Sequence, residues 1–62
     1  MDDILRKEVK MLKALQGVSY NSIAEDLEIK QSSFYNWLKG YYNLSFEKQK
    51  RLKEIIDLIS EV

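Results

Sequence analysis

The side chains best suited to specific polar contacts gather in one short stretch, between Lys30 and Lys39. Once its apolar residues are set aside, the outer positions carry amide, hydroxyl and ammonium groups and no carboxylate. A planar amide can pair with a nucleic-acid base edge that offers one donor and one acceptor, and an ammonium group can pair with a phosphate. This pattern predicts a surface that contacts base edges and phosphates. Its members are Lys30, Gln31, Ser32, Tyr35, Asn36 and Lys39.

Other kinds of chemistry have little support in the composition. The 62 residues contain no histidine and no cysteine, which removes the commonest general base and the thiolate ligands of metals. The acidic pairs Asp2–Asp3 and Glu25–Asp26 are adjacent in sequence, so their carboxylates do not converge on one site. The two glycines are isolated and form no phosphate-cradling loop. We therefore expect no enzyme activity, no cofactor, no metal and no small-molecule ligand.

The spacing of apolar residues predicts four to five short helices and no strand, so the expected fold class is all-α. So short a chain builds one core, and residues 1–62 are expected to form a single domain. The first helix is expected over residues 3–16, with Gly17 following its C-terminus. The last is expected over about residues 45–60, with Ser45 as its N-cap. Their apolar stripes are Ile4, Leu5, Val9, Leu12 and Leu15 in the first helix and Leu52, Ile55, Ile56 and Ile59 in the last.

Two shorter helices are expected between these, in a helix-turn-helix motif of about residues 19–40. Ser19 is a suitable N-cap for the first helix of the pair, and Gly40 closes the second. The small side chain of Ala24 allows the two helices to cross closely. The spacing makes Trp37 a core residue rather than a base-stacking one. The two apolar faces are Ile23, Ala24 and Leu27, and Phe34, Trp37 and Leu38.

The formal net charge is zero, which argues against a strongly basic nucleic-acid binder. The charges are unevenly placed, however, because residues 17–29 carry three acids and no cation, whereas residues 30–51 carry five cations and one acid. A local basic face is sufficient for phosphate binding, and the other interpretation is an ordinary solvated helix surface. Lys48 and Arg51, early in the last helix, are further candidates for phosphate contact.

These features resemble the helix-turn-helix of the λ repressor and Cro group, including the wider Xre-like regulators of bacteria and phages. The resemblance covers about residues 12–56. The stretch 29–40, IKQSSFYNWLKG, is similar to the repressor's recognition helix, which opens with a Gln-Ser pair and ends at a Gly. Two positions depart from the family pattern: Glu28 stands where a Gly in a left-handed conformation is usual, and Tyr20 where a bracing Gln is usual. The matching positions are Ile23, Ala24, Leu27, Ile29, Gln31, Ser32, Phe34, Trp37 and Gly40.

The resemblance implies a λ-repressor-like fold and a sequence-specific transcriptional regulator that binds double-stranded DNA. The second motif helix would enter the major groove, where the amide of Gln31 pairs with an adenine. The loop after this helix would touch the sugar-phosphate backbone, and the free N–H groups at the start of the first motif helix would bind a phosphate. The expected DNA-binding residues are Ser19, Tyr20, Lys30, Gln31, Ser32, Tyr35, Asn36, Lys39, Tyr41 and Asn43.

A homodimer on a palindromic operator is expected, because one unit of this size contacts too few bases for tight specific binding. Repression by occluding a promoter is the simplest mechanism. The apolar residues at the end of the last helix exceed what one small core needs. Either this end folds back onto the first helix, or it forms an interface, as small exposed apolar patches commonly do. The expected dimer contact consists of Leu58, Ile59 and Val62.

Two further expectations concern location and partner. No apolar run reaches the roughly 20 residues of a membrane span, and the N-terminus lacks the apolar core of a signal peptide, so a cytoplasmic protein is expected. In size the chain is closest to the Cro-like switch proteins of phages or mobile elements. The alternative is a helix-turn-helix that binds a protein partner, as small phage inhibitors including some anti-CRISPR proteins do. Zero net charge and the acids of residues 17–29 support this alternative.

Overall fold

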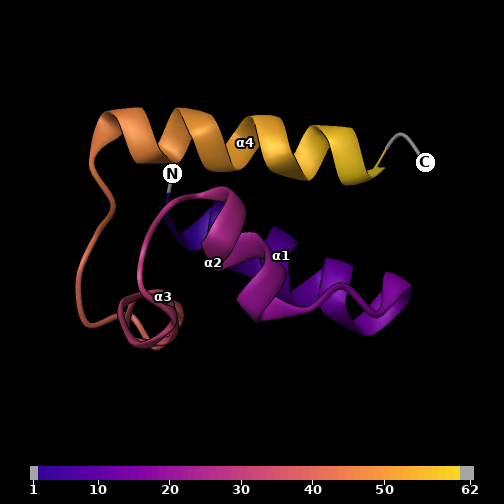
Figure 1. Ribbon diagram of the computed structural model, residues 1–62, viewed down its shortest axis with the longest axis horizontal. Helices are drawn as coiled ribbons and strands as arrows, with labels where there is room; N and C mark the ends of the chain where they lie inside the picture. The colour runs from indigo at the N-terminus through magenta and orange to yellow at the C-terminus, as the bar shows by residue number, and fades with distance from the viewer. Residues whose placement is uncertain (1, 61–62) are drawn as a thin grey trace.

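The computed structural model describes residues 2–60 of the chain. It contains four helices: α1 (Asp2–Gln16), α2 (Tyr20–Asp26), α3 (Gln31–Leu38) and α4 (Phe46–Ser60). No strand is present among the described residues, and the expected all-α fold class is confirmed. α4 packs along α1, and α2 packs against both α3 and α4. α3 is viewed nearly end-on in Figure 1, so it runs across the direction of the other helices.

The helix boundaries have local causes that the sequence already indicated. α1 ends before Gly17, whose φ of 69° lies in the left-handed region that favours glycine. Ser19 caps α2, because its hydroxyl oxygen accepts hydrogen bonds from two backbone N–H groups of that helix. Gly40, with a φ of 88°, follows α3 in the same way. The Ser45 hydroxyl accepts a hydrogen bond from the first turn of α4. These four predicted end signals are confirmed.

One apolar core holds the four helices together. Trp37 and Phe34 are fully buried at its centre, with their ring centroids 5.5 Å apart. Large aromatic rings bury roughly 150–250 Å² each and dominate a core of this size. The prediction that Trp37 is a core residue is therefore confirmed. The other buried apolar residues are Leu5, Val9, Leu12, Ile23, Ala24, Leu27, Leu38, Leu44, Leu52, Ile55 and Ile56.

The apolar stripe predicted for α1 is too wide. Ile4 and Leu15 are 63% and 76% exposed, so the prediction that they belong to the core is wrong. Of the predicted stripe, only Leu5, Val9 and Leu12 are buried, at the spacing of one narrow helical face. The reason is that the neighbouring helices cover only this face of α1, and the flank that carries Ile4 and Leu15 meets solvent.

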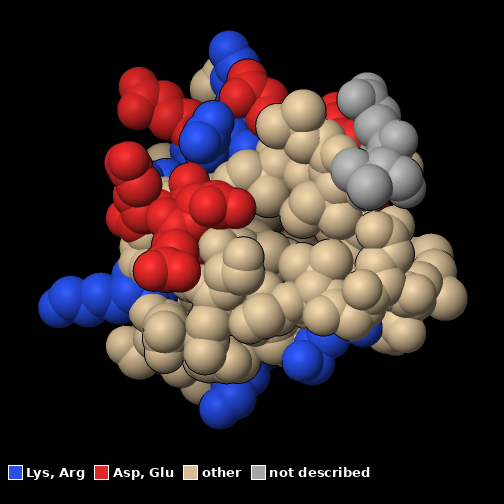
Figure 2. Space-filling model, turned by 45° about the vertical axis from the view of Figure 1, so that its right-hand side comes forward, with Lys and Arg blue, Asp and Glu red and all other residues tan. Residues whose placement is uncertain are grey.

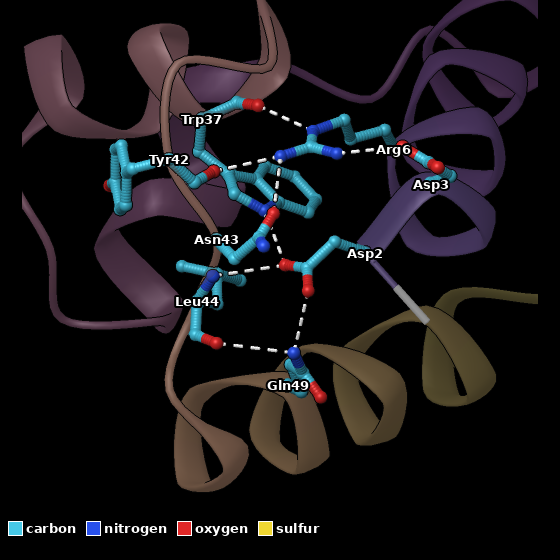
Figure 3. A network of polar contacts seen from close by, with 8 residues as sticks. All are labelled: Asp2, Asp3, Arg6, Trp37, Tyr42, Asn43, Leu44 and Gln49. Atoms are coloured by element: carbon cyan, nitrogen blue, oxygen red, sulfur yellow. Dashed lines mark hydrogen bonds and ion pairs between the residues drawn. The ribbon is translucent and has the colours of Figure 1, made fainter.

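A buried carboxylate at the start of α1 joins three distant segments (Figure 3). Oδ1 of Asp2 accepts hydrogen bonds from the indole Nε1 of Trp37 at 2.8 Å and from the backbone N–H of Leu44 at 2.9 Å. Oδ2 accepts a hydrogen bond from Nε2 of Gln49 at 2.7 Å. Among residues 2–60, Asp2 is the one charged side chain that is buried. It connects α1 to α3, to the loop before α4 and to α4 itself.

The surroundings of Asp2 favour its charged form. Burial raises the pKa of this carboxyl group, but the hydrogen bonds from Leu44 and Trp37 and the positive charge of Arg6 outweigh that effect. The pKa in the folded protein is therefore lower than the ordinary value of 3.8. As the pH falls, the unfolded chain binds the proton at a higher pH than the folded protein does. Asp2 in its charged form therefore stabilises the fold at pH values above 3.8. This stabilisation is lost as the pH falls through the lowered pKa.

Asp2→Asn is expected to reduce the free energy of unfolding at neutral pH by about 1–3 kcal/mol, because buried N–H donors lose a charged acceptor. The deficit should shrink as the pH falls below the ordinary aspartate pKa of 3.8 and through the lowered pKa of the folded protein, where the wild-type carboxylate is itself protonated. Urea denaturation at several pH values measures both effects. Asp26→Asn is the matched control, since Asp26 is exposed at the end of α2. A deficit that stays constant down to about pH 2 contradicts the role of the charge.

Candidate nucleic-acid interface

α3 presents one buried face and one exposed polar face. Phe34, Trp37 and Leu38 are turned into the core. No acidic residue occurs in α3 or at the residue on either side of it. The six polar candidates are all exposed, as the sequence predicted, and so form one uncovered surface: Lys30, Gln31, Ser32, Tyr35, Asn36 and Lys39.

The N-terminus of α3 has no side-chain cap. Lys30 occupies the N-cap position with extended backbone angles, and its side chain makes no capping hydrogen bond. The first backbone hydrogen bond of this helix runs from the N–H of Phe34 to the carbonyl of Lys30, at 3.0 Å. The N–H groups before Phe34 therefore have no helical partner, and such groups attract anions.

The turn between α2 and α3 has the backbone conformation that the resemblance implied. Glu28 has a φ of 61°, in the left-handed region, although it is not a glycine. Ile29 follows and packs against the core, which fixes where α3 begins. The ammonium group of Lys48 donates a hydrogen bond to the carbonyl of Leu27 at 2.9 Å. Lys48, a candidate for phosphate contact, therefore neutralises the C-terminal end of α2.

Tyr35 on α3 is tied to the start of α2. Its hydroxyl donates a hydrogen bond to Oδ1 of Asn21 at 3.1 Å. Its ring also meets the ring of Tyr20 edge-on, with centroids 5.9 Å apart. Tyr20 is half-buried and packs against Phe34, and the ammonium group of Lys13 lies 4.8 Å from the centre of its ring. Tyr20 thus supports α3 through its ring.

Asn21 is a member of this surface that sequence reasoning missed. It is exposed, and its side chain joins α2 to α3 across 14 residues of sequence. Its position directly after Tyr20 and within the first turn of α2 was the available signal. Ser19, by contrast, is exposed as expected, and its oxygen is occupied by the two N–H groups of its own helix.

The loop after α3 is held by Arg6 of α1 (Figure 3). The guanidinium group donates hydrogen bonds to the Trp37 carbonyl at 2.6 Å and to the Tyr42 carbonyl at 2.8 Å. It also donates to Oδ1 of Asn43 at 3.3 Å and pairs with the carboxylate of Asp3 at 2.9 Å. Asn43, a predicted contact residue, is exposed. The hydrogen bond from Arg6 nevertheless holds its side chain in place. Sequence reasoning did not identify Arg6.

The two tyrosines of this loop differ in their surroundings. Tyr41 is exposed, so its side chain is free to contact a ligand. This exposure is what the predicted contact with a sugar-phosphate backbone requires. The hydroxyl of Tyr42 donates a hydrogen bond to the carbonyl of Ser33 at 2.8 Å, which fastens the loop to the first turn of α3. Tyr42 therefore stabilises the loop that presents Tyr41.

Charge is unevenly distributed over the surface. Figure 2 shows acidic side chains gathered in one part of the visible face, beside a wide uncharged area with basic side chains along its lower edge. Within residues 2–60, Lys30 and Lys39 are in no ion pair. Arg51, in contrast, pairs with Glu54 at 3.7 Å on the exposed side of α4. Lys30 and Lys39 therefore place an unpaired cation at each end of α3, whereas on α4 Arg51 is paired and Lys48 is bonded to the Leu27 carbonyl.

The predicted dimer residues do not form one patch of equal exposure. Leu58 is 65% exposed and available for contact. Ile59 is half-buried and packs against the core of its own chain. Val62 lies outside the described residues. Of the two members that the structure describes, Leu58 is the one left uncovered.

Metal sites and membrane-spanning helices were also sought in the described part of the chain. Residues 2–60 hold no group of three or more His, Cys, Asp and Glu side chains arranged to bind a metal ion. None of the described helices combines the length and apolar character needed to cross a membrane. Comparisons with protein-family models, with curated proteins and with solved structures found no match to this chain.

Arg6→Lys is expected to loosen the loop after α3. A lysine ammonium group cannot reproduce the planar fork that reaches both carbonyls, so the free energy of unfolding should fall by about 1–2 kcal/mol. Amide hydrogen exchange should accelerate in residues 41–44 more than in α4. Lys7→Arg is the control, since Lys7 is exposed one residue further along α1. Unchanged exchange in the loop would show that Arg6 does not hold it.

Proposed function

We propose that this protein is a sequence-specific, double-stranded DNA-binding transcriptional regulator of the helix-turn-helix type. The observation that carries this proposal is the outer face of α3. This face exposes two amides and a hydroxyl, from Gln31, Asn36 and Ser32, between the ammonium groups of Lys30 and Lys39. Amides suit adenine edges and lysines suit phosphates, so this order of groups matches a helix lying in a major groove.

The rigidity of α3 supports the same proposal. Base readout needs side chains held in a fixed position relative to the phosphate backbone. The buried ring of Trp37 anchors α3 from behind, and Tyr35 ties it to α2. The uncapped N-terminus of α3 adds free N–H groups at the end of the helix that would approach DNA.

Repression by a homodimer is the simplest mode of action. Two copies related by a two-fold axis would place their α3 helices in successive major grooves, roughly 34 Å apart, on a palindromic operator. Occupancy of such a site over a promoter blocks transcription without further chemistry. The exposed Leu58 near the end of α4 is the residue we propose for the dimer contact, together with Ile59 and Val62.

One observation favours a second candidate function, the binding of a protein partner. Three acidic side chains, Glu25, Asp26 and Glu28, are exposed at the end of α2 and in the turn that leads to α3. They would repel a phosphate close to the start of α3, whereas a basic protein surface would pair with them. The salt dependence of binding distinguishes the two functions. DNA binding that relies on phosphate contacts weakens steeply as the salt concentration rises.

A selection from random duplex DNA at near-physiological salt tests the proposed function. We expect enrichment of a two-fold symmetric motif whose half-sites are centred about one helical turn apart. Such a motif would establish both the sequence preference and the dimer. A folded protein that enriches no sequence would contradict the proposal and favour the protein-binding function.

Gln31→Ala is expected to weaken binding to the selected duplex by about 1–3 kcal/mol and to relax the preference at one base pair of each half-site. Its binding to unrelated duplex should change little, because phosphate contacts are retained. Fluorescence anisotropy on matched and single-base-changed duplexes measures both. Gln16→Ala is the control, since Gln16 is exposed at the far end of α1. If Gln31→Ala keeps the full sequence preference, Gln31 does not read a base.

A further inference from the structure

α1 carries a row of basic side chains that lies outside the predicted interface. Arg6, Lys10 and Lys13 are four and three residues apart, so they share one face of the helix. At a rise of about 1.5 Å per residue, the row follows the helix for roughly 10 Å. Lys10 and Lys13 are exposed, and within residues 2–60 neither is in an ion pair.

Both ends of this row touch the candidate interface. At one end, Arg6 donates hydrogen bonds to the Tyr42 carbonyl and to Asn43, in the loop that follows α3. At the other end, the ammonium group of Lys13 lies 4.8 Å from the centre of the Tyr20 ring, at the first residue of α2. The row therefore connects the two edges of the surface whose middle is α3. Lys10 lies between these two ends.

The members of the row differ in what they can bind. The guanidinium of Arg6 is already engaged with two carbonyls, an amide oxygen and the Asp3 carboxylate, so its role is structural. The ammonium groups of Lys10 and Lys13 have no hydrogen-bond acceptor within residues 2–60. The Tyr20 ring holds the ammonium group of Lys13 beside the start of α2.

We propose that Lys10 and Lys13 form a second phosphate-binding row for double-stranded DNA, beside the face of α3. This inference rests on the proposed function, and its ligand is the phosphodiester backbone that flanks the base pairs facing α3. Continuity with the interface at both ends favours DNA over an acidic protein, which would need no contact with α2 or with the loop. The row adds two cations to Lys30 and Lys39, and so provides local positive charge to a chain whose net charge is zero.

Salt dependence of DNA binding tests the row directly. The double variant Lys10→Gln/Lys13→Gln keeps the long side chains and removes two charges. In a plot of log K against log salt concentration, each lost phosphate contact lowers the slope by roughly 0.9, so the double variant should lower it by about 2. Affinity should fall by a similar factor for the selected duplex and for unrelated duplex, because phosphates carry no sequence information.

Lys50→Gln/Lys53→Gln is the matched control. It removes the same charge from exposed positions on α4, where Lys50 lies over Phe46 and Lys53 pairs with Asp57. We expect its slope to stay close to that of the wild type. Equal slopes for the two double variants would show an effect of overall charge and would contradict the proposed phosphate-binding role of Lys10 and Lys13. A wild-type slope in the row variant would overturn it too.

Two further readouts separate this inference from the function on which it rests. If the wild-type protein binds no duplex at any salt concentration, both the proposed function and the row are overturned. If the row variant changes the preferred sequence, Lys10 or Lys13 contacts bases and the phosphate assignment is wrong. Single Lys10→Gln leaves the contact with Tyr20 intact, so it provides the test if the double variant does not fold. Its expected change in slope is about 1.

Discussion

The orientation of α3 depends on one carboxylate, that of Asp2. Its two oxygens accept hydrogen bonds from Trp37 on α3, from Leu44 in the following loop and from Gln49 on α4. Two of these bonds are buried, where an unsatisfied donor costs more than a bond lost at the surface. Arg6, one helical turn later, holds the end of α3 and its loop from the same side. α1 therefore positions the outer face of α3 from behind, without using the side chains of that face.

This arrangement separates the residues that hold α3 from those free to contact a ligand. Gln31, Ser32 and Asn36 are exposed and make no side-chain hydrogen bond within residues 2–60. Tyr35 is the exception, because its hydroxyl is tied to Asn21. A tethered hydroxyl keeps its oxygen as an acceptor and loses its freedom to turn along the helix. Tyr35 thus belongs to the α2–α3 contact as much as to the exposed face, and the remaining amides and hydroxyl are the groups that the proposed base readout would use.

The sequence predicted the features that depend on near neighbours. Ser19 as a cap and Trp37 as a core residue follow from spacing within one or two helical turns, and so does the exposed face of α3. The role of Asp2 could not be predicted, because its partners lie 35 to 47 residues away and an acid at a helix start is usually solvated. Ile4 and Leu15 were misplaced because a stripe on one helix does not reveal how much of it the neighbours cover. The structure therefore differs from the prediction in the contacts between helices and not in the helices themselves.

Charge placement limits how a polyanion could approach this surface. Lys48 already neutralises the end of α2, and Arg51 is paired on α4, so the cations of α3 itself are Lys30 and Lys39. The acids of residues 17–29 lie at the end of α2 and in the turn, where they repel phosphate. A neutral chain with these acids gains little from non-specific attraction, since that attraction depends on the number of phosphates neutralised. If this face binds DNA, hydrogen bonds to base edges therefore have to supply a larger share of the affinity than they do in a strongly basic repressor.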